Sequence, residues 1–225
     1  MKFSRLDQVQ RAIKIIALLR GSTQGMIEPS IFQIVQKFGS DPFLVLVSCL
    51  LSLRTRDTVS LPASLRLFEQ ARTPQQIIDM PTSDIESLIY PVGFYRTKAR
   101  RLQEISHILI EHYQGTVPST EAELLALPGV GRKTMALVLT DGFGRPALCV
   151  DTHVHRISNR LGLVRTTKPA QTEKALKELL PQEYWAEYNR LIVMWGQNVC
   201  LPIAPLCSRC VLYDLCPRVG VTKQR

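Results

Sequence analysis

Apolar residues recur at intervals of three and four along most of the chain, the spacing that places side chains on one face of a helix. The clearest run extends from Arg5 to Arg20 and ends before Gly21. Asp41-Pro42 supplies a capping side chain and an initial proline for a second, strongly apolar helix. Helices are predicted over 5–20, 43–52, 62–69, 74–79, 82–89, 97–113, 120–127, 132–140, 152–161, 172–180 and 184–199. No segment shows the sustained alternation of a strand, so the sequence predicts an all-α fold.

The net charge of the chain indicates which kind of partner it binds. Its 225 residues include Lys+Arg 28 against Asp+Glu 19, and the formal net charge of +9 favours a polyanionic partner. The longest apolar stretch, 43–53, is too short to span a bilayer, and the N-terminal segment lacks the pattern of a secretory signal. We therefore expect no membrane partner and a cytoplasmic protein with reduced thiols, nucleoid-associated if the organism is prokaryotic.

A glycine-containing turn, Leu-Pro-Gly-Val-Gly-Arg-Lys-Thr at 127–134, lies between two predicted helices. Its glycines allow positive φ and leave no side chain in the way of an approaching backbone. Amides of the turn would then point outward together, at the positive end of the next helix's dipole. The pattern predicts a helix-hairpin-helix that grips DNA phosphates without reading bases, rather than an ordinary interhelical turn. The candidate DNA contacts are Gly129, Val130, Gly131, Arg132 and Thr134.

Two residues near this turn are candidates for covalent chemistry. Lys133 lies in the first helical turn beside Arg132, where the helix dipole disfavours a cation, so its neutral and nucleophilic form should be easier to reach. Asp151 follows 18 residues later, in Val-Asp-Thr-His, at the cap of another predicted helix. Taken singly, a phosphate-binding or solvated lysine and a simple helix cap are the commoner roles of such residues.

Four cysteines near the end of the sequence predict a metal centre. The spacing C-x6-C-x2-C-x5-C is formed by Cys200, Cys207, Cys210 and Cys216. Four thiolates can bind a tetrahedral Zn²⁺ or a [4Fe–4S] cluster, and their chemistry alone does not separate the two. The other two cysteines, Cys49 and Cys149, lie in apolar segments and are expected to be buried thiols.

Together these motifs resemble those of the endonuclease III family, within the helix-hairpin-helix DNA glycosylase superfamily. The resemblance covers about residues 35 to 216 and continues through Leu50-Leu51-Ser52, Gly93 with Tyr95, and Lys98-Ala99. It implies a [4Fe–4S] cluster rather than zinc, because the cysteine spacing matches the family's cluster loop. It also implies a base-excision repair enzyme, in which Lys133 attacks C1′ of an extruded damaged nucleotide and forms an imine before β-elimination. Asp151 would stabilise positive charge on the sugar.

The chain departs from the family at two positions. Where the family usually carries glutamine, this chain has Arg54, which would fill the gap left by the extruded nucleotide and pair with an orphaned guanine, or else contact a phosphate. Phe94 replaces an aliphatic wedge and would enter the base stack, with a core position as its alternative. Tyr95 and His153 complete the candidate DNA contacts, and a helix-surface position is the alternative for His153. We expect an altered preference for the opposite base.

The resemblance further implies two all-α domains with a DNA-binding cleft between them. One is a six-helix domain with the hairpin over 35–145, and the other is discontinuous, over 1–34 and 146–225, and carries the cluster. The expected protein is a monomeric, bifunctional DNA N-glycosylase and abasic-site lyase. Its substrate would be double-stranded DNA containing abasic sites or damaged bases, oxidised pyrimidines in particular. The alternatives are a monofunctional mismatch glycosylase of the adenine type and a non-catalytic, redox-sensing DNA-binding module.

Overall fold

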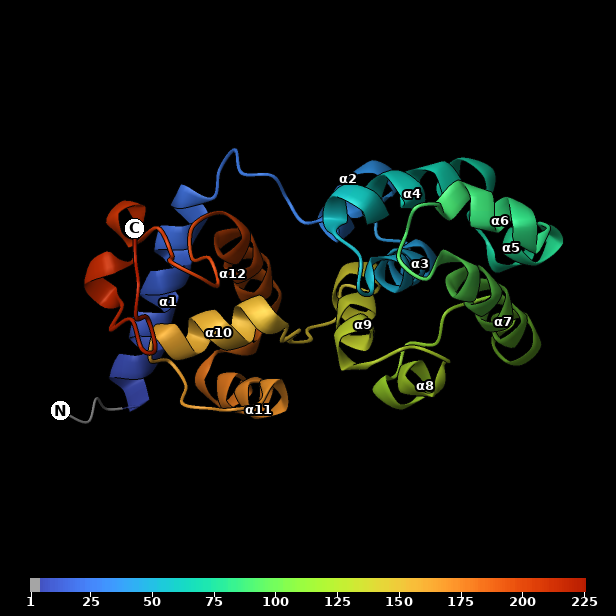
Figure 1. Ribbon diagram of the computed structural model, residues 1–225. Coiled ribbons are helices and arrows are strands. Elements are labelled where there is room, and N and C mark those ends of the chain that lie inside the picture. Colours follow the sequence, from blue (N-terminus) through green and yellow to red (C-terminus); the bar gives the residue numbers. More distant parts are fainter. Residues whose placement is uncertain (1–4) are drawn as a thin grey trace. The chain divides into compact units, whose positions relative to one another are not determined.

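The computed structural model describes residues 5–225, which are folded into helices and loops without a strand (Figure 1). This confirms the predicted all-α class. The chain divides into two compact units, Pro29–Arg145 and the described residues up to Glu28 together with Pro146–Arg225. The division at residue 29 falls six residues before the predicted boundary at 35, and it keeps the helix that follows intact. No helix within residues 5–225 has the length and apolarity needed to cross a bilayer.

The unit at 29–145 contains eight α-helices, two more than the six expected from the family resemblance. They are α2 (Ser30–Phe38), α3 (Pro42–Ser52), α4 (Asp57–Gln70), α5 (Pro74–Asp79), α6 (Thr82–Ile89), α7 (Tyr95–Tyr113), α8 (Glu121–Ala126) and α9 (Arg132–Leu137). A π-helix, η1 (Val138–Gly142), continues directly from α9.

Helix α3 forms the centre of this unit. The side chain of Asp41 accepts hydrogen bonds from Phe43 N at 2.8 Å and Leu44 N at 3.0 Å, and Pro42 begins the helix, as the sequence predicts. All nine residues from Phe43 to Leu51 are buried, because α2, α4, α7, α9 and η1 all pack around this helix. Cys49 lies within this segment and is buried, as expected.

The other unit packs α1 (Arg5–Ser22) against α12 (Trp185–Asn198), with α10 (Thr152–Arg160) and α11 (Pro169–Leu179) completing it (Figure 1). This unit also contains three short 3-10 helices: η2 (Gln182–Tyr184), η3 (Cys207–Arg209) and η4 (Tyr213–Leu215). Its core includes Ile16 from α1, Ile157 from α10 and Ile192 from α12, all buried. The fully buried Tyr188 shares a 2.7 Å hydrogen bond between its hydroxyl and Ser158 Oγ, which satisfies both polar groups.

Two helices differ from the sequence prediction for identifiable reasons. The helix predicted to begin at Pro62 begins at Asp57, so the proline lies inside α4 and removes one backbone donor there. The helix predicted over 132–140 changes to the wider π form at Val138. At the end of this π-helix, a Cβ added to Gly142 would lie 2.8 Å from Pro42 Cα, so glycine allows η1 to approach the start of α3.

Asp141 in η1 predicts a pH-dependent stability. Burial raises the pKa of its carboxyl group to about 7, and its Oδ2 is buried without a hydrogen bond. Between the carboxyl's ordinary pKa of 3.8 and about 7, the folded state binds more protons than the unfolded state, so the free energy of unfolding falls as pH rises. Between pH 5 and pH 8 the wild type should lose about 2–3 kcal/mol relative to Asp141→Asn.

Urea unfolding of both proteins at the two pH values measures this difference. Comparing the same pair at each pH removes any constant effect of the asparagine amide. A stability difference that does not change between pH 5 and pH 8 would contradict the prediction.

Candidate active site and nucleic-acid interface

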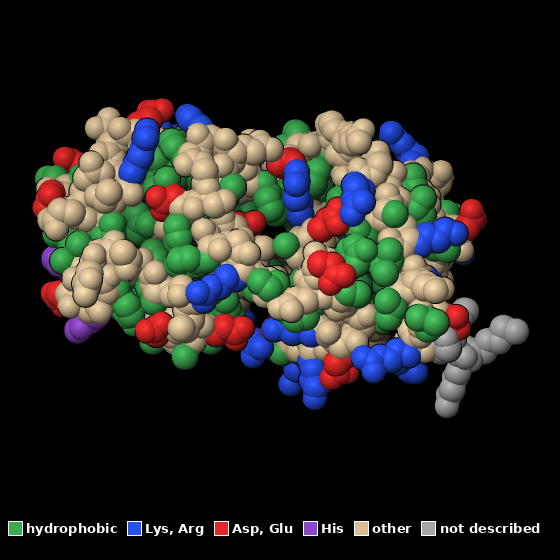
Figure 2. All heavy atoms as spheres, turned by 180° about the vertical axis from the view of Figure 1, so that it is seen from behind, with side chains coloured by type: hydrophobic (Ala, Val, Ile, Leu, Met, Phe, Trp, Pro, Cys, Tyr) green, Lys and Arg blue, Asp and Glu red, His purple; other side chains and the backbone are tan. Residues whose placement is uncertain are grey.

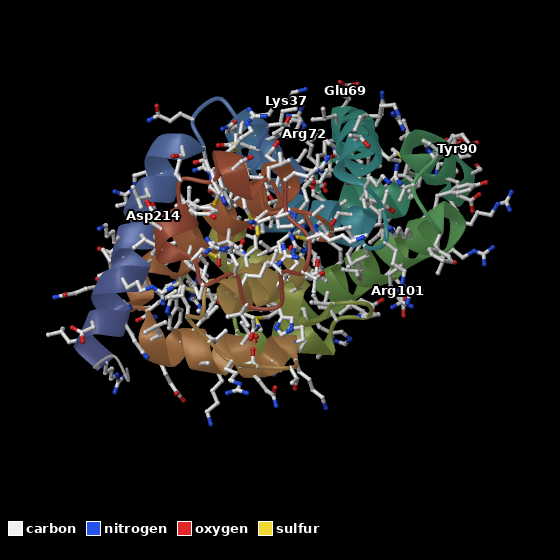
Figure 3. All side chains as sticks on the ribbon, turned by 60° about the vertical axis from the view of Figure 1, so that its left-hand side comes forward. Lys37, Glu69, Arg72, Tyr90, Arg101 and Asp214 are labelled. Atoms are coloured by element: carbon white, nitrogen blue, oxygen red, sulfur yellow. The ribbon has the colours of Figure 1, made fainter. Side chains whose placement is uncertain are left out.

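The hairpin at 127–131 joins α8 to α9. Val130 N donates a hydrogen bond to the Leu127 carbonyl at 3.1 Å, and Gly131 forms the N-cap of α9. Gly129 has a φ of +78°, and a Cβ at this position would lie 3.2 Å from Nη1 of Arg101, which extends from α7 (labelled in Figure 3). The turn therefore requires glycine at 129, both for its backbone conformation and for space.

Exposure divides the hairpin candidates into two groups. The exposed members are Gly129, Gly131, Arg132 and Lys133, whereas Val130 and Thr134 are only 7% and 2% exposed. The two buried side chains turn into the unit, so a phosphate contact at these positions would use backbone amides.

Lys133 is the second residue of α9 and follows Arg132, so two exposed cations stand at the positive end of the helix dipole. Behind them Met135 and Ala136 are buried and fix this turn of α9 against the unit's core. Basic side chains are not confined to the hairpin. Figure 2 shows Lys and Arg side chains on the visible surface of each unit, interspersed with Asp and Glu.

Asp151 is the N-cap of α10, as the sequence predicts. Its Oδ1 accepts hydrogen bonds from His153 N and Val154 N, both at 2.9 Å. Both capping bonds use the same carboxylate oxygen. The residue is partly buried and stands at the N-terminus of α10.

His153 is partly buried and packs on α12. A Cβ added to Gly196 would lie 2.4 Å from His153 Nδ1 and 3.0 Å from its Cβ, so the histidine side chain fills the place of a side chain at 196. Arg156 Nη2 donates to His153 Nδ1 at 3.2 Å and to the Cys200 carbonyl at 2.8 Å. From the sequence, His153 is expected to bind phosphate, to orient Asp57 or to lie on the helix surface. The structure adds a packing contact with α12, which fixes the first turn of α10.

Arg54 and Phe94 lie together on the surface of the 29–145 unit. The guanidinium carbon of Arg54 is 5.9 Å from the centroid of the Phe94 ring, a cation–π arrangement. Both residues adopt the left-handed backbone conformation, with φ of 53° and 59°. Phe94 is 64% exposed, which excludes the core position that was its alternative. Tyr95, next to it, is partly buried, and its ring meets that of Tyr90 edge-on at 5.4 Å.

Lys98 is a residue whose importance the sequence analysis missed. It was noted only as part of a family motif, whereas the structure places its ammonium against the segment that carries Arg54, with burial that lowers its pKa to about 8. A lysine in the first turn of α7 gives no sequence signal for this contact, because its partners lie more than forty residues away.

The four C-terminal cysteines line one pocket, together with Arg160, Leu206 and Tyr213 among others. Arg160 is buried and holds the loop between the first two cysteines, donating to the Leu201 and Pro202 carbonyls at 2.7 Å each. Burial raises the pKa of the Cys207, Cys210 and Cys216 thiols. Within residues 5–225, no three His, Cys, Asp or Glu side chains are close enough to hold a single metal ion.

A family model of the HhH-GPD superfamily of base excision DNA repair proteins matches residues 47–182. Endonuclease III of Thermotoga maritima is 51% identical to this chain over 196 residues, which cover 85% of this chain and 92% of that protein.

Two solved structures are also similar. One is a non-covalent endonuclease III–DNA complex, with a TM-score of 0.82 and 32% identity, covering 96% of this chain and 97% of that chain. The other is a trapped endonuclease III–DNA covalent intermediate with an estranged adenine, with a TM-score of 0.74 and 36% identity, covering 84% and 92% of the two chains.

Proposed function

Since the chain belongs to the endonuclease III family of HhH-GPD base excision DNA repair proteins, we propose that Lys133 and Asp151 carry its reaction. The protein is a DNA glycosylase with abasic-site lyase activity. The observation that carries the assignment is an exposed lysine at the second position of α9, directly after the glycine hairpin. The relative captured as a covalent intermediate with DNA supports a nucleophilic mechanism.

In the proposed reaction, the neutral Nζ of Lys133 attacks C1′ of a damaged nucleotide. The Nζ–C1′ bond forms as the N-glycosidic bond breaks, and the base leaves with the bonding electrons and takes up a proton. Opening of the sugar ring gives an imine between Lys133 and C1′. Loss of a proton from C2′ then expels the 3′ phosphate oxygen and cuts the strand, and hydrolysis of the imine by water restores the lysine.

Asp151 has an electrostatic and a proton-accepting role in this proposal. As the base leaves, positive charge develops on the sugar, and a nearby carboxylate stabilises it. The carboxylate also helps to remove the proton that the attacking amine must lose. The capping bonds from His153 N and Val154 N hold the carboxylate in one orientation, which favours both tasks.

We assign the DNA contacts to two surfaces of the described residues and give His153 a supporting role. The hairpin amides and Arg132 would bind phosphate, Arg54 and Phe94 would occupy the gap left by the extruded nucleotide, and His153 would support the start of α10. The exposure of Arg54 and Phe94 supports this role, because an exposed aromatic residue paired with a cation is ready to stack on bases. We propose a monomer acting on oxidised pyrimidines, with a preference for guanine opposite the lesion.

A panel of lesion duplexes in all four opposite-base contexts tests the function. We expect excision of oxidised pyrimidines with strand cleavage that appears before alkali treatment, fastest opposite guanine. Cleavage only after alkali would indicate a monofunctional glycosylase of the mismatch type. Inactivity on every lesion and on abasic DNA would favour a DNA-binding module without catalysis.

The cysteine pocket is proposed to hold a [4Fe–4S] cluster on Cys200, Cys207, Cys210 and Cys216. The C-x6-C-x2-C-x5-C spacing resembles that of the cluster loop of the endonuclease III family, which supports a cluster over a tetrahedral Zn²⁺. The four cysteines line one pocket, in which each thiolate would bind a different iron. When bound, the cluster would crosslink the cysteine loop around Arg160 and could exchange an electron.

Metal analysis of the purified protein tests this assignment. We expect a brown protein with about four irons per chain, and loss of the colour together with a lower melting temperature after chelation. A colourless protein containing one zinc per chain would contradict it.

A further inference from the structure

The side chain of Lys98 ties the first turn of α7 to the loop at 51–55. Its Nζ donates to the Leu51 carbonyl at 2.7 Å, the Leu53 carbonyl at 2.6 Å and Thr55 Oγ1 at 3.2 Å. Its backbone N donates to the Phe94 carbonyl at 3.0 Å. A single residue is thus bonded to the segment that carries Arg54 and, through its own backbone, to Phe94.

The position of the ammonium suits its charge. Leu51 and Leu53 lie at the last turn and the C-cap of α3, where unpaired carbonyls form the negative end of the helix dipole. A cation there is favourable, and three oxygen acceptors match the three donors of an ammonium group. Since its donors are used in this way, Lys98 is suited to hold structure and not to attack a sugar.

The two residues that Lys98 joins need an external restraint. Arg54 and Phe94 both have positive φ, a strained conformation for a residue with a side chain, which persists only where the surroundings impose it. Gly93 adds to the restraint, because its N donates to Thr55 Oγ1 at 3.2 Å and a Cβ there would lie 3.1 Å from the Arg54 carbonyl. Hydrogen bonds and close packing therefore hold the two loops together beside the Lys98 ammonium.

We propose that Lys98 is a positioning residue that sets the mutual placement of Arg54 and Phe94, and so governs recognition of the damaged base and of the base opposite. The inference rests on the proposed roles of Arg54 and Phe94 in DNA binding. Lys98 acts through these two residues, and Lys133 remains the nucleophile.

The test compares Lys98→Met with the wild type and with Arg100→Met, which removes one positive charge from the exposed side of the same helix. Lys98→Met should lower excision of a damaged base at least tenfold and reduce the preference for the opposite base. Cleavage at a preformed abasic site should fall less than threefold, because that nucleotide has no base to extrude. Hydrogen exchange of the amides at 51–55 and 92–95 should become faster in Lys98→Met alone.

A double-mutant cycle separates positioning from a general structural role. In an Arg54→Ala, Phe94→Ala background, Lys98→Met should cause no further loss of excision, since the groups that it positions are gone. A tenfold loss that persists in that background, or unchanged excision in Lys98→Met, would overturn the proposal. If Lys98→Met does not fold, Lys98→Gln, which keeps two donors, takes its place with the same criteria.

Borohydride trapping on abasic DNA distinguishes this inference from the proposed function. If the wild type gives no trapped adduct, the proposed function fails. If the wild type and Lys98→Met both give the adduct and also excise lesions equally, only the inference about Lys98 fails.

Discussion

Replacement of Lys133 by alanine is expected to abolish the adduct that borohydride traps between the protein and abasic DNA. The imine is the species that borohydride reduces, and it requires a primary amine bonded to C1′. Excision and strand cleavage should fall by about 10³-fold or more, the scale on which enzymes lose activity with their nucleophile. Gel assays of trapping and of cleavage before alkali measure both effects.

The fold should not contribute to this loss. Lys133 is exposed in α9, so its truncation opens no cavity in the core, and the melting temperature should stay within a few degrees of the wild type. Arg132→Ala is the matched control, since it removes the neighbouring cation and should weaken DNA binding while the adduct still forms. An undiminished adduct in Lys133→Ala would assign the nucleophile to another amine.

Asp151→Asn should lower excision by about 10²–10⁴-fold without disturbing the helix that the residue caps. The asparagine side chain keeps an oxygen that can accept from His153 N and Val154 N, so α10 retains its cap. What is lost is the negative charge that stabilises the sugar and the acceptor for the proton of the amine. Single-turnover excision rates, measured with enzyme in excess, report this step directly.

Asp151→Ala provides the comparison, because it removes the cap as well as the charge. It should lose about 0.5–2 kcal/mol of stability, whereas Asp151→Asn should lose only a fraction of that. If the two variants are equally unstable and equally slow, the cap alone accounts for the effect of Asp151. A wild-type rate in Asp151→Asn would remove the carboxylate from the reaction altogether.

Local sequence signals were sufficient to predict the elements that present the candidate residues. The start of α3 follows from Asp41-Pro42, and the turn before α9 follows from Gly129, because capping and positive φ depend on neighbouring residues. The cysteine spacing likewise predicted residues that share a pocket. These features depend on interactions within a few residues along the chain.

Features that depend on distant contacts were not predictable in this way. Proline at position 62 is typical of the beginning of a helix, yet α4 begins five residues earlier, where Asp57 Oδ2 accepts a hydrogen bond from Ser30 N of α2. Arg54 and Phe94 have positive φ, which neither residue favours by itself, and the contacts of their loops come from distant parts of the chain, such as the bond from Lys98 Nζ to the Leu53 carbonyl. The burial of Thr134 depends on how α9 packs, which the hairpin motif does not specify.

The missing side chain at Gly196 has an implication for how variants of this protein should be interpreted. Even one methyl group at 196 would displace the imidazole of His153. It would also disturb the adjoining backbone, whose amides orient the Asp151 carboxylate. Gly196 lies within a helix that is not proposed to contact DNA. It would thus affect the reaction indirectly, through His153 and Asp151. Surveys of harmful changes that count only substrate-touching positions would overlook it.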